Sequence, residues 1–80
     1  MKTVTVRFYS LLGARRGIQT ESYSTEAETA RQLLHEIQAG NQITLTTNVV
    51  AAAINDHFAD WDSPIRDGDQ ITLLPPFSGG

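Results

Sequence analysis

The sequence predicts an α+β fold in which a single helix lies across one face of a mixed sheet. Two patterns in the 80 residues support this class. Apolar and polar residues alternate near both ends of the chain, over residues 4–9 and 70–74, as expected of half-buried strands. Between them, residues 30–37 carry apolar side chains at helical spacing. Because the chain has no repeats or linkers, these elements predict one small domain.

A hairpin is expected at the start of the chain. Val4–Tyr9 is the first strand, and Ile18–Tyr23 is a return strand of weaker pattern. The residues between them, 10–17, can close the hairpin through a short helical turn, because Gly13 and Gly17 suit turn or cap positions.

The helix is expected to follow a capping box. In Thr25-Glu26-Ala27-Glu28, Thr25 would be the N-cap and Glu28 would lie three residues into the helix. Gly40 stands where a C-terminal cap belongs. The apolar stripe of this helix consists of Ala30, Leu33, Leu34 and Ile37.

The second half of the chain is expected to add two strands. After polar residues 41–47, which we assign to a loop or irregular strand, the apolar run Val49–Ile54 predicts a buried strand ended by a turn. Residues 58–66 are predicted to form a mixed loop. Asp67-Gly68-Asp69 is a strong turn signal, and it precedes the last strand, Gln70–Leu74.

A ubiquitin-like β-grasp accounts for this order of elements, because its first and last strands lie side by side at the centre of the sheet. Pro75-Pro76 cannot donate hydrogen bonds to a neighbouring strand, so pairing should end there. We therefore divide the chain into a β-grasp domain at residues 1–74 and an extended functional tail at residues 75–80. In this arrangement the tail projects from a rigid sheet.

Composition argues against several classes of function. The net charge is -3, with six Lys and Arg residues, which argues against binding to nucleic acid. No apolar run approaches the ~18 residues of a membrane span, and the opening residues read as a strand, so we expect a soluble cytoplasmic protein that does not bind membranes. With no cysteine, and with no spaced companion for His35 or His57, no metal site is expected.

The chain ends in Gly79-Gly80, a segment without Cβ atoms. Such a segment can lie extended in a tunnel too narrow for any other residue type, and its last carbonyl carbon carries no bulk that would hinder activation. Pro75-Pro76 would stiffen the tail and lower the entropy cost of inserting it into a partner. The alternative interpretation is a frayed terminus, since chain ends are often poorly ordered.

Several segments resemble the small, sulfur-carrying subunits of molybdopterin synthase. They are Val6–Ser10, Ala53–Asn55, Ile65–Ile71 and Leu74–Gly80. The similarity covers the whole chain in length and element order. Its specific part is the turn, the Pro-Pro pair and the Gly-Gly ending in that order and spacing. Residue 77 departs from the pattern, because Phe77 stands where this family usually has a small aliphatic residue.

The resemblance implies a chemical use for the tail. An E1-like adenylating enzyme would use ATP to activate the carboxylate of Gly80, and a sulfur donor would then convert it to a thiocarboxylate. In a heterotetramer with the large synthase subunit, the loaded tail would deliver sulfur to cyclic pyranopterin monophosphate. No permanently bound cofactor is implied, and with no cysteine the C-terminus is the only candidate to carry sulfur. The residues implied to enter the partner are Pro75, Pro76, Phe77, Ser78 and Gly79.

The surface that docks onto the partner is predicted to include Leu74, Trp61 and Phe58. Leu74 should point away from the helix, whereas Trp61 could instead cover the core. The aspartates in residues 56–69 fit solvated loops, or else docking onto a basic partner.

Three other functions stay open. They are a carrier for thiamine or tRNA thiolation, a ubiquitin-like modifier of protein lysines, and a binding module whose Gly-Gly is incidental. The Pro-Pro pair favours a sulfur carrier of molybdopterin synthase over a carrier for thiamine synthesis.

Overall fold

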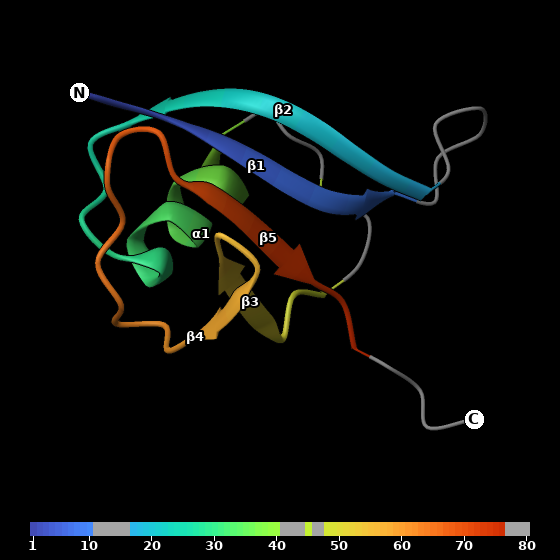
Figure 1. The fold of residues 1–80 in the computed structure, drawn as a ribbon. Helices are drawn as coiled ribbons and strands as arrows, with labels where there is room; N and C mark the ends of the chain where they lie inside the picture. The colour runs from blue at the N-terminus through green and yellow to red at the C-terminus, as the bar shows by residue number, and fades with distance from the viewer. Residues whose placement is uncertain (11–16, 41–44, 46–47, 77–80) are drawn as a thin grey trace.

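The computed structural model describes residues 1–10, 17–40, 45 and 48–76. Within these residues one helix lies across one face of a five-stranded sheet (Figure 1). The strand order is β2-β1-β5-β3-β4; β1 and β5 are parallel, and the other neighbours are antiparallel. This arrangement confirms the predicted β-grasp and its central pair of strands. The elements are β1 (Lys2–Ser10), β2 (Gly17–Thr25), α1 (Ala30–Ala39), β3 (Ala51–Ile54), β4 (His57–Ala59) and β5 (Gln70–Leu74).

The hairpin of β1 and β2 is longer than predicted. Its pairing runs from Lys2 opposite Thr25 to Ser10 opposite Gly17. Gly17 has a φ of +106°, a left-handed conformation that would strain a residue with a side chain. The predicted connection over residues 10–17 lies outside the described residues except at its two ends, and the predicted loop over residues 41–47 does so except at Leu45.

The helix begins later than the predicted capping box placed it. Thr29 is the N-cap, and its Oγ1 accepts a hydrogen bond from the Gln32 backbone N–H at 3.2 Å. The Gln32 side-chain oxygen in turn accepts from the Glu28 N–H at 2.8 Å. The Thr29 hydroxyl therefore satisfies one orphan N–H of the first turn, and the Gln32 side chain reaches back to the N–H of the residue before the N-cap. The assignment of Thr25 as N-cap was wrong, because Thr25 is the last residue of β2.

Thr25 instead joins the hairpin to the helix. Its buried hydroxyl accepts a hydrogen bond from the Ala27 N–H at 2.9 Å and donates one to the Glu36 carboxylate at 2.6 Å. At the other end of α1, the Gly40 N–H donates to the Glu36 carbonyl at 2.9 Å, which confirms the predicted C-cap position.

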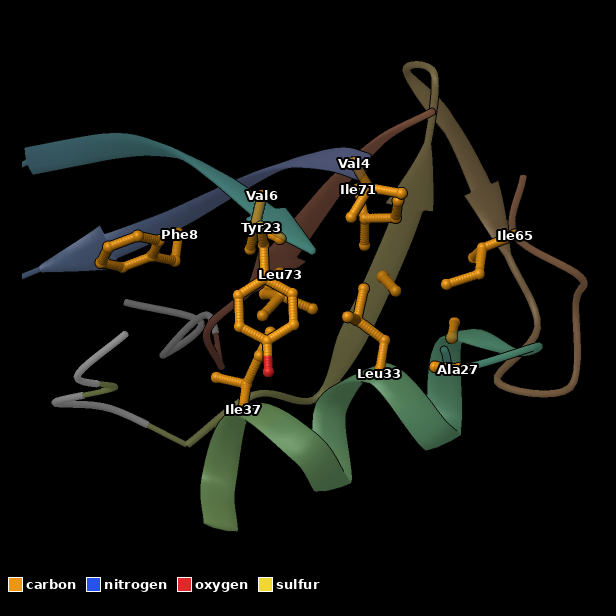
Figure 2. Close-up of a cluster of buried hydrophobic side chains, with 12 residues drawn as sticks. Val4, Val6, Phe8, Tyr23, Ala27, Leu33, Ile37, Ile65, Ile71 and Leu73 are labelled. Carbon is orange, nitrogen blue, oxygen red and sulfur yellow. The ribbon is translucent and has the colours of Figure 1, made fainter. Parts of the chain in front are cut away.

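The core fills the space between the sheet and α1 (Figure 2). Leu33 and Ile37 of the helix are almost completely buried against the sheet. The loop between β4 and β5 closes the helix N-terminus, where the backbone N–H groups of Ala30 and Arg31 donate to the carbonyls of Ser63 and Trp61. The buried hydrophobic residues are Val4, Val6, Phe8, Tyr23, Ala27, Ala30, Leu33, Ile37, Ala52, Ile65, Ile71 and Leu73.

A second, short hairpin replaces the start of the predicted loop over residues 58–66. Asn55 and Asp56 have φ values of 52° and 70°, the left-handed pair typical of a two-residue hairpin turn. The turn pairs β3 with β4, so the loop assignment was wrong for Phe58 and Ala59. The predicted strand over residues 49–54 is shorter than expected and begins at Ala51.

Candidate functional site

The residue that precedes the tail is fixed within the sheet. Leu74 ends β5, pairs with Ala51 of β3, and accepts a hydrogen bond at its carbonyl from the Val50 N–H at 2.9 Å. Pro75 is half-buried and Pro76 is exposed. Because β5 lies between β1 and β3 (Figure 1), the chain leaves the domain from the middle of the sheet. The predicted sulfur-bearing residue, Gly80, lies outside the described residues, as do three of the residues predicted to enter the partner, Phe77, Ser78 and Gly79.

Alternation along β5 separates two faces of the sheet. Ile71 and Leu73 are buried beneath α1, whereas Thr72 and Leu74 point to the other side and are half-buried. The orientation predicted for Leu74 is therefore confirmed. No described helix covers this second face, which we call the open face (Figure 1). By strand pairing, its central residues are Arg7, Tyr9, Ile18, Thr20, Ala51, Ala53, Phe58, Thr72 and Leu74.

Large apolar side chains are exposed on the open face. Phe58 is 82% exposed, Ile18 60% and Tyr9 41%. In register, Tyr9 is opposite Ile18, and Ala53 separates Phe58 from Thr72 of β5. Exposed large apolar side chains gathered on one uncovered face are consistent with a protein contact site.

Trp61 lies in a different environment from the other two predicted contact residues. It is half-buried and packs against the hydrophobic core. Its carbonyl accepts the Arg31 N–H at 2.8 Å, which fixes it near the start of α1. The structure thus places Phe58 and Leu74 on one face, and it gives Trp61 the core-covering position that the sequence left as the alternative.

The aspartate-rich turn before β5 is organised by its own side chains. Asp67 Oδ1 accepts the Thr3 N–H at 2.7 Å, and Asp69 Oδ2 accepts the Arg66 N–H at 2.8 Å. These carboxylates therefore hold the turn, which is a more specific role than the solvated loop or docking patch considered from sequence. Gly68, with a φ of +87°, supplies the left-handed residue that the turn requires.

Asn55 links this turn to the β3–β4 hairpin, a role that the sequence analysis did not assign. Its Nδ2 donates to Asp69 Oδ1 at 3.0 Å, and its Oδ1 accepts the Gln70 N–H at 2.9 Å. Its own N–H donates to the Gln70 carbonyl at 2.8 Å. The signal was the preference of Asn for left-handed turn positions; its long-range partners are visible only in the fold.

The described residues include one buried phenol and two surface ion pairs. Burial, and then the nearby Glu36 carboxylate, raise the pKa of the Tyr23 phenol. Ion pairs join Arg7 to Asp56 and Arg31 to Asp62.

In the part of the chain that the structure describes, no three His, Cys, Asp or Glu side chains gather to form a metal site. Among the described residues, no helix has both the length and the apolar character that a membrane span needs.

Comparison with known proteins identifies the family. The ThiS family matches residues 6–80, a range that includes both the open face and the tail. The chain belongs to the ThiS family. It is 24% identical over 80 residues to the molybdopterin synthase sulfur carrier subunit of Escherichia coli K12, covering 96% of this chain and 99% of that protein.

A solved structure extends the comparison to three dimensions. This ThiS-family chain matches a chain in the complex of subunits 1 and 2 of the molybdopterin-converting factor from Helicobacter pylori 26695. The TM-score is 0.59 and the identity 32%, with 98% of this chain and 99% of that chain covered. The matches confirm both the fold and the resemblance to the small subunits of molybdopterin synthase.

Proposed function

We propose that this chain is the sulfur carrier and small subunit of molybdopterin synthase. The observation that carries the proposal is the full-length likeness to a sulfur carrier subunit and to a chain of the two-subunit converting factor. The geometry supports it, because the central strand β5 leads directly into the Gly-Gly tail.

The proposed chemistry takes place at the carboxylate of Gly80. A carboxylate is a poor electrophile, so an E1-like enzyme would use ATP to form an acyl-adenylate and release pyrophosphate. A sulfur donor would then supply hydrosulfide, which attacks the carbonyl carbon and expels AMP to leave a thiocarboxylate. This acid ionises readily and is a good nucleophile. Its sulfur would form a carbon–sulfur bond with cyclic pyranopterin monophosphate, and hydrolysis would return the Gly80 carboxylate.

The proposed partner is the large synthase subunit, in a heterotetramer of two small and two large chains. The solved complex of subunits 1 and 2 supports a partner of this kind. We place the contact on the open face, where Tyr9, Ile18 and Phe58 expose apolar surface and Leu74 leads into the tail. Docking there would bring the tail and the partner's active site together, which supplies the proximity that the reaction needs.

Intact mass spectrometry tests the loading step. After incubation with the activating enzyme, ATP and a sulfur donor, the chain should gain about 16 Da as sulfur replaces oxygen on the reactive carboxylate. A chain lacking Gly80 should keep its fold and gain nothing. Absence of the gain with a competent cognate enzyme would contradict the carrier function.

The acceptor is tested with the loaded chain. Together with the large subunit, it should convert cyclic pyranopterin monophosphate to molybdopterin. Transfer to a thiazole precursor or to tRNA without transfer to the pterin would instead establish one of the other carrier functions. Formation of an isopeptide with protein lysines would establish a modifier.

A further inference from the structure

Arg7 is a cation at the centre of an otherwise uncharged part of the open face. It lies on β1, opposite Thr20 of β2 and Thr72 of β5, and the same row across the sheet continues to Ala53 and Phe58. Its side chain is 33% exposed, so two thirds of it is already covered by its neighbours. A partner that covers Phe58 and Leu74 must also cover this guanidinium.

The contact that Arg7 makes within the described residues is weak. Its Nη1 lies 3.8 Å from Asp56 Oδ1, well beyond the ~2.7–2.9 Å of a charge-assisted hydrogen bond. The side chain of Asp56 is 79% exposed and belongs to the β3–β4 turn at the rim of the face. A guanidinium offers a planar fork of donors suited to a carboxylate. One long contact to a solvated aspartate uses little of that capacity.

We propose that Arg7 receives a carboxylate of the large subunit when the open face docks, and so fixes the register of the small subunit on its partner. The inference rests on the proposed function. Docking removes water from the guanidinium, and an unpaired buried cation is strongly unfavourable. The partner surface must therefore present an acceptor at this point, and an acidic side chain matches the fork best. The exposed apolar residues elsewhere on the open face supply contact area, whereas Arg7 supplies specificity.

The acidic group that Arg7 would bind differs from the kind of partner that the net charge of the chain favours. At -3, the chain as a whole would favour a basic partner in long-range encounter. Arg7, by contrast, would bind one acidic group of the partner, within a contact that is otherwise largely uncharged. Asp56 is not needed in this contact, because it can return to water at the rim.

Affinity measurements with the purified large subunit test the inference. Arg7→Met keeps most of the aliphatic stem and removes the charge, and we expect it to raise Kd at least about tenfold, mainly through faster dissociation. Arg7→Lys keeps the positive charge but lacks the planar fork of donors, so its Kd should lie between those of the wild-type chain and Arg7→Met. Asp56→Asn is the matched control: asparagine tolerates the left-handed φ of 70° at this position, removes the charge of the ion pair within the chain, and should leave Kd within about twofold. Thermal unfolding of each variant checks that the fold is retained.

The outcomes separate the inference from the function on which it rests. Loss of affinity in Arg7→Met with retention in Asp56→Asn supports the inference. If Arg7→Met binds as tightly as the wild-type chain, or if Asp56→Asn weakens binding equally, the inference is overturned while the proposed function stands. If the wild-type chain itself does not bind the large subunit, the proposed function fails and the inference falls with it.

Discussion

Replacing Asn55 by alanine should destabilise the fold by about 2–3 kcal/mol, from two separable sources. The side chain donates to Asp69 Oδ1 at 3.0 Å and accepts the Gln70 N–H at 2.9 Å. Each of these hydrogen bonds contributes about 1 kcal/mol at an exposed site. Asn55 also has a φ of 52°, and holding alanine there costs roughly 1 kcal/mol more. Urea unfolding, followed by the fluorescence of the single tryptophan, measures the sum.

Asn55→Gly separates the two sources. Glycine adopts the left-handed conformation without strain but lacks both side-chain hydrogen bonds. It should therefore be less destabilising than Asn55→Ala by about 1 kcal/mol. The reasoning is refuted if Asn55→Ala unfolds within ~0.5 kcal/mol of wild type, or if the glycine variant is the less stable of the two.

Three further predictions concern the core and the open face. Thr25→Val should cost about 2 kcal/mol because it leaves the Ala27 N–H without its acceptor, whereas Thr25→Ser should stay near wild type; equal unfolding free energies for the two would contradict this. The raised pKa of Tyr23 means that its contribution to stability is complete below the unfolded value of 10.0 and is lost as pH rises through the folded pKa. Urea unfolding from neutral to strongly alkaline pH should therefore show a smaller alkaline loss in Tyr23→Phe, and identical losses would rule this out. Phe58→Ser should weaken binding to the large subunit at least about tenfold while leaving the melting temperature nearly unchanged, because Phe58 is 82% exposed; unchanged binding would exclude Phe58 from the contact.

The fold could be predicted because its two periodicities are local. Val4, Val6 and Phe8 alternate along β1, Leu33 and Ile37 recur along α1, and all five are buried as expected. Neither pattern depends on a distant partner. The order of the strands then followed from the few ways in which one helix can cover one sheet.

The helix start could not be predicted because two segments fit the same local rule. Thr25 and Glu28 match a capping box as well as Thr29 and Gln32 do. Pairing of Thr25 with Lys2 decides between them, and this contact joins residues far apart in sequence. The strand β4 was missed for a similar reason: it has three residues, and pairing with β3 rather than an alternating pattern defines it.

The sequence could predict the candidate site only where the alternation of side chains along a strand was enough to assign a residue to a face. This alternation placed Leu74 on the open face. The order of the motifs singled out the terminal glycines, whose role stays a prediction. The alternation within one strand could not place Arg7 and Phe58 in the same row of the sheet, because β5 and β3 lie between their strands and the register of these pairings aligns them. The sequence placed Asn55 at a turn, but it could not indicate the hydrogen bonds of this residue, since its partners, Asp69 and Gln70, follow it by fourteen and fifteen residues.

A carrier must meet two partners in turn, first the enzyme that loads it and then the one that unloads it. Under the proposed function, the reactive carboxylate is the same in both encounters, so the folded body must distinguish the partners. In this chain the groups that stabilise the fold lie beneath α1 or in the turns, as Leu33 and Asp69 do. The open face instead exposes Tyr9, Ile18 and Phe58, which contribute little to the core. That separation allows the docking surface to change with its partners while the strand that carries the tail stays fixed.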